Sequence, residues 1–354
     1  MSTVAPFAKP SDFPAVLRAF GARPLVACHN DADGLSAGAI MLRVLSRAGL
    51  EPEARIVGRG ENAYSAAFAA EIAARRPGGL VIADLGVSAQ PPGDVTPTVV
   101  IDHHVPTGRP AGALVVSGID DDPIPTSSLL AYRCAEAAGL ADDLLWLAAL
   151  GIIGDMAESA GFPEMEAARR AYGVTSLRNA ASLINAPRRT GSGNASPALS
   201  LLLQATGPKQ ALDGSLPETQ ALLDAKREVQ DALAAARRTP PKIAGDVAIV
   251  MFSSPCQVHP LIAQQWRGRL KDRIVIAANA GFRPGYVHFA ARTALDVDLI
   301  EFFAAHRPPG ADEQYGSGHR AASGGALSFD IWNGFVRLLG FGRELEAPAG
   351  RVAA

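Results

Sequence analysis

The chain of 354 residues has little cysteine and no long uncharged apolar run. Its three cysteines, Cys28, Cys134 and Cys256, are far apart, odd in number and without the spacing of a zinc site. They argue against a disulfide framework and predict a reducing, cytoplasmic environment. No run of about 18 apolar residues is free of charge, glycine and proline, and residues 1–20 lack a signal-peptide pattern. We therefore expect neither secretion nor membrane insertion.

Charge is balanced over the whole chain but not between its halves. With 33 Lys+Arg, 35 Asp+Glu and 48% hydrophobic residues, the sequence is typical of a folded globular protein and excludes a disordered one. At about 100 to 200 residues per domain, its length predicts two domains. Residues 1–185 hold 14 basic and 20 acidic side chains, whereas residues 186–354 hold 19 and 15. The acidic half would suit bound cations, and the basic half an anionic substrate.

The first half alternates short apolar runs with helical patterns. Such alternation predicts a parallel sheet with crossover helices, in which ligands bind beyond the carboxyl ends of the strands. The expected strands are at 24–28, 80–84 and 99–102. One helix is expected to begin near Ser36, and two more are expected at 126–138 and 142–153.

The composition changes after Asn185, where a stretch rich in Pro, Gly and Ser predicts a linker or hinge. The second half then predicts a smaller mixed α/β domain, with strands at 246–252, 273–279, 286–292 and 324–329 and helices at 259–270 and from about Asp296. The expected division is a first domain at 1–185, a linker with a helix at 186–241, and a second domain at 242–354.

Carboxylates and imidazoles follow each predicted strand of the first half. They are His29, Asp31 and Asp33 after the first strand, Asp84 after the second, Asp102, His103 and His104 after the third, and Asp155 at the end of the buried helix. If residues 29–33 are extended, the side chains of His29, Asp31 and Asp33 point the same way. So many carboxylates at one sheet edge would repel each other unless cations neutralise them.

These residues predict a metal site, because oxygen and imidazole ligands without thiolates favour Mn²⁺, with Mg²⁺ or Co²⁺ as alternatives. Taken singly, an Asp at the end of a strand is more often a cap or turn residue than a ligand, but four segments with the same ending favour ligands. Two ions about 3.5 to 4 Å apart would acidify water and clamp a phosphate, so we predict phosphoester hydrolysis. The expected sets are His29, Asp31 and Asp84 for one ion, and Asp33, Asp84, His103 or His104, and Asp155 for the other.

Four segments resemble, in order, the motifs of the DHH phosphoesterase family: HNDADG (29–34), VIADLG (81–86), VIDHH (100–104) and GIIGD (151–155). Two further segments, HFAARTALDVDLIEFF (288–303) and YGSGHRAASGGA (315–326), resemble the family's companion DHHA1 domain. Together they cover most of residues 20–345. The spacing His29-x-Asp31-x-Asp33-Gly34 is similar to that of the RecJ-like subgroup, although His29 stands where RecJ usually has Asp.

The resemblance implies a Mn²⁺-dependent hydrolase with a DHH catalytic domain and a DHHA1 domain that binds substrate, the substrate being held between them. Its catalytic residues would be Asp84, Asp102, His103 and His104; we favour His103 over His104 as the metal ligand. The implied substrate contacts are Arg292, Gly316, Gly318, His319 and Arg320, in part on a glycine-rich turn suited to a phosphate. Ser317 departs from the family pattern, which usually has Gly there.

The expected substrate is single-stranded DNA or RNA, a short oligonucleotide or a small nucleotide. The chain stops near the point where full-length RecJ continues into an OB-type domain, which favours a short or small substrate. The alternatives are a nucleotide phosphatase or cyclic-dinucleotide phosphodiesterase, and a non-catalytic nucleic-acid-binding accessory of replication or repair. A homodimer is left open.

Other polar residues receive structural interpretations. Ser36, Thr126 and Ser127 are expected to cap helices. Trp266 and its basic neighbours suit either a nucleic-acid patch or a solvated helix face, and we favour the helix face. His259 and His288 are expected to be structural.

Overall fold

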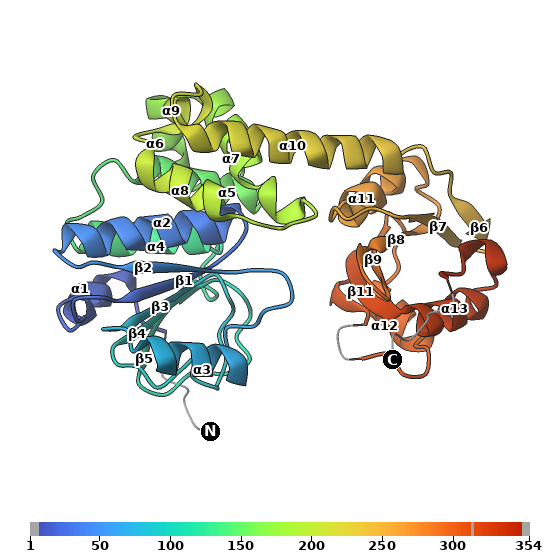
Figure 1. Ribbon diagram of the computed structural model, residues 1–354, viewed down its shortest axis with the longest axis horizontal. Coiled ribbons are helices and arrows are strands. Elements are labelled where there is room, and N and C mark those ends of the chain that lie inside the picture. The colour runs from blue at the N-terminus through green and yellow to red at the C-terminus, as the bar shows by residue number, and fades with distance from the viewer. Residues whose placement is uncertain (1–6, 313–314, 349–354) are drawn as a thin grey trace. The chain divides into compact units, whose positions relative to one another are not determined.

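The computed structural model describes residues 7–312 and 315–348 and divides into two compact units (Figure 1). The first unit contains the described residues up to Arg188 together with Gly193–Asp224. The second contains Arg189–Ser192 and the described residues from Ala225 onward.

The first unit is built on a five-stranded parallel sheet of order β2-β1-β3-β4-β5. Its strands are β1 (Leu25–His29), β2 (Glu53–Val57), β3 (Leu80–Ala83), β4 (Thr98–Asp102) and β5 (Ala113–Ser117). Cys28 pairs with Ala83, which pairs with Ile101, so β1, β3 and β4 end at the same level. The three predicted strands are thus central neighbours, and the two edge strands are additional.

Helices cover both faces of this sheet. Alternate strand residues face opposite sides: Val26, Val81 and Val99 pack with α2, α4 and α5, whereas Leu80 and Ile82 pack with α3. Figure 1 shows α3 on the face opposite α2 and α4. In the described part of the chain, no helix is long and apolar enough to cross a membrane. The helices are α1 (Phe13–Leu17), α2 (Ala32–Arg47), α3 (Ala66–Arg75), α4 (Ser127–Ala137), α5 (Leu145–Gly154), α6 (Pro163–Tyr172), α7 (Val174–Ile184), α8 (Ser196–Gln204) and α9 (Pro208–Leu212).

The segment 186–241, expected as a linker or hinge, is mostly helical. Helix α8 buries Leu199, Leu201 and Leu202 in the core of the first unit, which explains why residues 193–224 belong to that unit. Helix α10 (Pro217–Ala236) then runs without a break past Asp224, where the first unit ends. The apolar residues of α8 therefore extend the first unit beyond the boundary that composition suggested.

The second unit is a six-stranded mixed sheet of order β10-β11-β9-β8-β7-β6 with helices packed on it, so the predicted mixed α/β class is confirmed. Among the strand pairs that the structure describes in this sheet, only β7 and β8 run parallel. The glycine-rich segment expected as a turn is partly strand β10, paired antiparallel with β11. The elements are β6 (Lys242–Ala244), β7 (Val247–Phe252), α11 (His259–Arg269), β8 (Ile274–Arg283), β9 (Tyr286–Thr293), α12 (Leu299–Ala305), β10 (Ser317–His319), β11 (Ala322–Ser328) and α13 (Phe329–Leu338).

All three cysteines are free and buried. Cys28 and Cys134 pack in the core of the first unit, and Cys256 packs in a cluster of the second. Burial raises the pKa of the Cys28 thiol to about 12 and, together with Glu228, that of Cys256 to about 11. Burial also raises the pKa of Cys134.

Candidate metal centre

The turn between β1 and α2 is shorter than the sequence predicted. Strand β1 ends at His29, and α2 begins at Ala32 rather than near Ser36. Asp31 caps this helix, because its Oδ1 accepts a hydrogen bond of 3.0 Å from the Gly34 amide. A Cβ at residue 34 would lie 2.5 Å from the Cβ of His29, so only glycine fits this turn.

The expectation of an extended segment carrying three parallel side chains is therefore wrong from Ala32 onward, because Asp31 is still extended but α2 begins at the next residue. Asp33 lies in the first turn of α2, where it belongs to a different group of side chains from His29 and Asp31. The Nδ1 of His29 lies 3.1 Å from Asp31 Oδ2. Because α2 begins directly after its cap Asp31, His29 and Asp31 lie in one group of candidate ligands and Asp33 lies in another.

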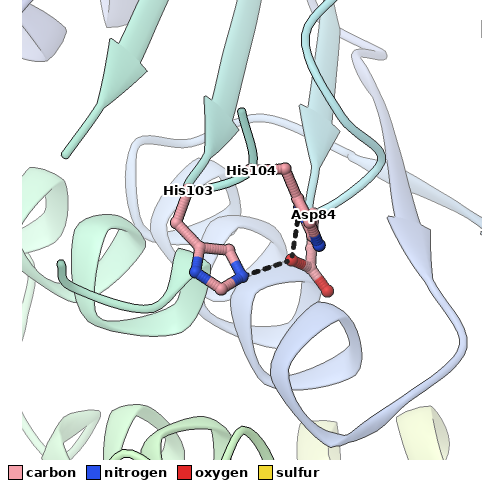
Figure 2. Close-up of side chains that lie close together, drawn as sticks. All are labelled: Asp84, His103 and His104. Carbon is pink, nitrogen blue, oxygen red and sulfur yellow. Dashed lines mark ion pairs between the residues drawn. The ribbon is translucent and has the colours of Figure 1, made fainter. Parts of the chain in front are cut away.

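Asp84 follows β3 directly and is 4% exposed. Its backbone has φ +63°, a left-handed conformation that Asp adopts more readily than most residues with a side chain. Its Oδ2 lies 3.5 Å from His29 Nδ1. Its Oδ1 lies 3.6 Å from His103 Nε2 (Figure 2). One carboxylate therefore faces side chains from both neighbouring strands.

Asp102 supports His104 and lies in none of the candidate metal groups of the described residues. It is fully buried, and its oxygens accept hydrogen bonds from the amides of Gly86 at 2.7 Å and His104 at 2.8 Å. The Nδ1 of His104 lies 3.1 Å from Asp102 Oδ1. Burial alone would raise the pKa of Asp102, but its contacts with His104 lower it.

The structure brings all seven predicted metal ligands together in three overlapping groups, within each of which the ligand atoms lie within 4.8 Å of one another. Asp84 belongs to two of them, as the expected bridging role requires. The Nε2 of His103 is buried and makes no hydrogen bond within the described ranges, although Asp155 Oδ2 lies 3.2 Å away. Such a nitrogen and its carboxylate neighbours fit a divalent cation. The groups are Asp84, His103 and His104; His29, Asp31 and Asp84; and Asp33, His103 and Asp155.

The electrostatics of these groups fit a site that is completed by cations. Burial and the neighbouring carboxylates of Asp84 and Asp155 raise the pKa of Asp33. Burial also raises the pKa of Asp84. For His29, burial alone would lower the pKa, but Asp31 and Asp84 raise it to about 10. Without cations, protons therefore reduce the repulsion among the carboxylates, and a bound metal would displace them.

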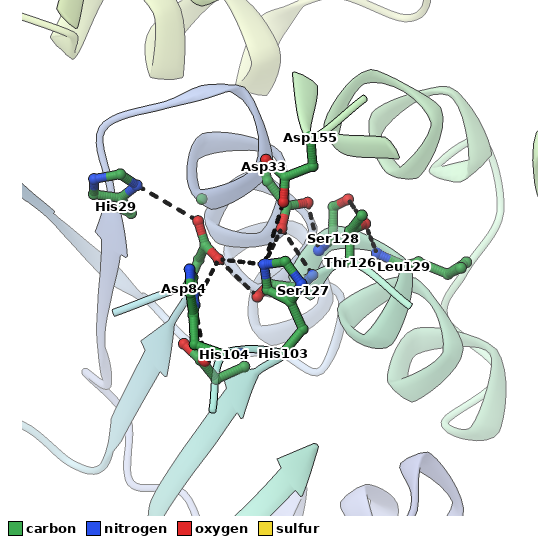
Figure 3. Close-up of polar contacts among 12 residues, drawn as sticks. His29, Asp33, Asp84, His103, His104, Thr126, Ser127, Ser128, Leu129 and Asp155 are labelled. Carbon is green, nitrogen blue, oxygen red and sulfur yellow. Dashed lines mark hydrogen bonds and ion pairs between the residues drawn. The ribbon is translucent and has the colours of Figure 1, made fainter. Parts of the chain in front are cut away.

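Two kinds of supporting contact escaped the sequence analysis, one from the start of α4 and one from Arg188. The carboxylate of Asp33 accepts hydrogen bonds from the amides of Ser127 and Ser128 at 2.8 and 2.9 Å, and the Ser127 hydroxyl donates to Asp84 Oδ1 at 2.9 Å (Figure 3). Arg188 Nη1 lies 3.3 Å from Asp31 Oδ2. Both kinds of contact join residues far apart in sequence, so no local pattern reveals them.

The predicted caps are only partly confirmed. Thr126 caps α4, since its hydroxyl accepts a hydrogen bond from the Leu129 amide. Ser127 is the first residue of that helix, and Ser36 lies buried within α2 rather than at its start.

A pocket of about 400 Å³ opens beside these groups. A larger hollow of about 510 Å³ belongs to the second unit, where α10 and the loop after β7 line it with two carboxylates and no imidazole. The smaller pocket is therefore the candidate substrate site. Its lining residues are His29, Asp31, Asp84, Leu85, Gly86, His104 and Asp155.

Three of the five predicted substrate contacts lie on strands of the second unit: Arg292 on β9, and Gly318 and His319 on β10, with β11 between these two strands. His319 on β10 pairs with Ala322 on β11, which pairs with Arg292 on β9. Arg292 is half-buried and donates to the Ala291 carbonyl, and burial together with Arg267 lowers its pKa. His319 is exposed, which leaves its ring accessible.

The remaining predicted contacts of this region differ in their surroundings. Arg320 is exposed and pairs with Asp296 at 2.6 Å. Gly316 and Gly318 have φ of +74° and +134°, and a Cβ at Gly318 would lie 2.4 Å from the Ala322 carbonyl oxygen. Close pairing of β10 with β11 therefore requires glycine at 318 by itself, whether or not a ligand binds there.

The basic residues around Trp266 and the two histidines expected to be structural contact other residues of the second unit. Arg267 on α11 donates to the Thr293 carbonyl, and the Arg269 guanidinium lies 5.1 Å from the Trp266 ring centroid. The rings of His259 and His288 both contact that of Phe282.

No family model matches this chain, and no curated protein sequence matches it. Solved structures do match it. The crystal structure of exonuclease RecJ bound to manganese is 21% identical, has a TM-score of 0.66, and aligns over 95% of this chain and 94% of its own. RecJ from Thermus thermophilus in complex with Mn²⁺ is 20% identical, with a TM-score of 0.67, over 95% of this chain and 55% of its own. The chain thus spans about half the length of the Thermus protein.

CDC45 from Entamoeba histolytica is also similar, at 8% identity and a TM-score of 0.57, over 94% of this chain and 99% of its own. At these levels of identity the comparisons establish the fold. The chain has the two-domain α/β fold of RecJ, as the motifs predicted.

Proposed function

We propose that the protein is a divalent-metal-dependent phosphoesterase of the DHH/DHHA1 family that hydrolyses phosphodiester bonds of single-stranded or short nucleic acid. The observation that carries the proposal is the set of three carboxylate and imidazole groups at the carboxyl edge of a parallel sheet, of which Asp84 joins two and His103 joins two. This set lies on the fold of RecJ, which has been crystallised with Mn²⁺ and with Mg²⁺. Ligands of parallel sheets bind at that edge.

The residues present fit two cations, with Mn²⁺ preferred. In the proposed arrangement, His29, Asp31 and Asp84 hold one ion, and Asp33, Asp84, His103 and Asp155 hold the other. When bound, such a pair supplies acidified water and neutralises phosphate charge. Asp84 is the shared ligand, since its two oxygens face the two sets.

His104 is proposed to contact the phosphate rather than to act mainly as a ligand. It lines the pocket and is half-exposed, and its Nδ1 lies beside Asp102. The hydrogen bond with Asp102 raises the pKa of His104, which favours the protonated ring as a donor. Asp102 therefore acts on the substrate through His104, by orienting the ring and favouring its charge. We retain His103 as the histidine ligand.

Within the second unit, Arg292 and His319 are proposed to bind a phosphate or a strand terminus. Their strands are separated by β11 alone, and their residues share one register level. Arg320, Gly316 and Gly318 remain proposed contacts, with the exposed Arg320 free to exchange Asp296 for a phosphate at little cost.

Hydrolysis is expected to require added divalent metal, with Mn²⁺ better than Ca²⁺, because a compact site needs an ion that acidifies water. The test incubates the demetallated and Mn²⁺-loaded protein with end-labelled DNA and RNA of increasing length, cyclic dinucleotides, nucleotides and pyrophosphate. A product ladder from linear strands supports the proposal. Cleavage of cyclic dinucleotides or nucleotides alone supports the small-substrate alternative, and strand binding without cleavage supports an accessory role. Full activity after EDTA would exclude the mechanism.

Removal of either substrate-binding side chain should weaken capture of an oligonucleotide. For Arg292→Ala and His319→Ala we expect kcat/KM to fall by an amount equivalent to about 1 to 3 kcal/mol of transition-state stabilisation, as for a lost charge-assisted contact. Metal content should not change. The loss should be small for an aryl phosphate ester, which has no remote groups to bind. Arg283→Ala, at the other end of the β8–β9 pairing, is the matched control. Equal losses on both substrates would show that the residues shape the metal centre instead.

A further inference from the structure

We propose that Ser127 is a positioning residue that holds Asp33 and Asp84 in fixed relation and thereby sets the affinity for the second of the two cations. The inference rests on the proposed function. The sequence interpretation gave Ser127 a capping role, but Thr126 supplies the side-chain cap of α4. The Ser127 hydroxyl is therefore available for another acceptor.

The contacts of Ser127 join two carboxylates that come from different elements. Its amide donates to Asp33 Oδ2 at 2.8 Å, and its hydroxyl donates to Asp84 Oδ1 at 2.9 Å. Asp33 lies in α2 and Asp84 follows β3, so the start of α4 is their common support (Figure 3). Ser127 and Asp33 are fully buried, and Asp84 nearly so. Water therefore has little access to replace these hydrogen bonds.

The two carboxylates repel each other in this buried space, and the start of α4 offsets part of that repulsion. Amides in the first turn of a helix have no partner within the helix, and Asp33 accepts two of them. The Ser127 hydroxyl acts on Asp84 alone. It fixes which oxygen faces His103, leaving Oδ2 toward His29. A carboxylate shared by two cations needs that orientation.

Ser128 provides a matched control within the same turn. It is also fully buried, and its amide also donates to Asp33. Its hydroxyl, however, lies 3.2 Å from the Ala148 carbonyl oxygen and 3.0 Å from the Thr126 hydroxyl. Alanine at either position keeps the backbone contacts to Asp33, and only alanine at 127 removes the hydrogen bond to Asp84.

The test is a Mn²⁺ titration of the full chain, read by calorimetry and by electron paramagnetic resonance. For Ser127→Ala we expect the first ion to bind as in the wild type and the second about 10- to 100-fold more weakly, as for other residues that orient ligands. The signal of a spin-coupled Mn²⁺ pair should fall in favour of single ions. Ser128→Ala should keep both ions, and Ser127→Thr should restore the pair.

Several results would overturn the inference. Ser127→Ala with two ions of wild-type affinity and a coupled signal would remove it while the proposed function stands. An equal loss in Ser128→Ala would assign the effect to the integrity of α4. A wild type that never binds a pair would overturn the proposed function and this inference together. If Ser127→Ala does not fold, Ser127→Cys, with its weaker donor, must bind the second ion less tightly than Ser127→Thr.

Discussion

Replacement of Asp84 by alanine should abolish hydrolysis, with a loss of at least about a thousandfold, or about 4 kcal/mol. The reason is that Asp84 is the carboxylate common to the groups built on His29 and on His103. Both cation affinities should fall. Added Mn²⁺ should also no longer raise Tm, because a ligand stabilises a protein only as far as it binds the folded state. Metal analysis, thermal melting and turnover together measure the change.

Two further variants serve as controls for this result. Asp142→Ala removes an exposed carboxylate of the first unit and should leave metal content and turnover unchanged. Asp84→Asn keeps the shape and an acceptor for Ser127 while it removes the charge, so it separates packing from electrostatics. If the alanine variant retained two Mn²⁺ ions and near-normal turnover, the assignment of Asp84 as the shared ligand would be wrong.

The second large effect is expected at Gly151, inside helix α5. A Cβ there would lie 2.0 Å from Ser128 Oγ and 2.3 Å from Asp33 Oδ1, and neither group has room to retreat because both are fully buried. Gly151→Ala should therefore lower the free energy of unfolding by about 1 to 3 kcal/mol, as overpacked cores do. Displacement of Asp33 should also weaken metal binding and reduce turnover.

A helical glycine elsewhere provides the control for Gly151. A Cβ at Gly334 in α13 meets no atom of the described chain within 4 Å. Gly334→Ala should raise the free energy of unfolding by about 0.5 to 1 kcal/mol through the lower entropy of the unfolded chain. Chemical denaturation measures both variants. A Gly151→Ala protein as stable and active as the wild type would show that α5 moves freely against α2 and α4.

The sequence analysis predicted the fold class and the edge of the sheet at which the candidate site lies. The buried apolar runs of β1, β3 and β4 are followed at once by His29, Asp84 and Asp102, and parallel pairing makes the ends of these strands meet. The grouping of seven residues therefore followed from local pattern and sheet geometry. That they bind metal stays a prediction.

The local pattern was insufficient where a helix cap or a distant contact decided the outcome. Asp33 was expected on an extended segment, but α2 begins at Ala32, directly after its cap Asp31, and places Asp33 in a helix. The contacts of Ser127 with Asp33 and of Arg188 with Asp31 span 94 and 157 positions, and neither has a periodic signature. Composition predicted a linker with a helix at 186–241, but it gave no sign that the apolar residues of α8 pack in the core of the first unit.

The buried cysteines have a consequence for the reactivity of the folded protein. A thiol must lose its proton before it attacks an alkylating reagent or a disulfide, and raised pKa values keep these thiols protonated. Cys28 directly precedes the candidate ligand His29, yet its buried thiol should neither compete for soft metals nor oxidise readily. Thiol reagents should reach these cysteines only when the packing around them opens. Cys28 and Cys134 thus mark opening of one core, and Cys256 marks opening of another.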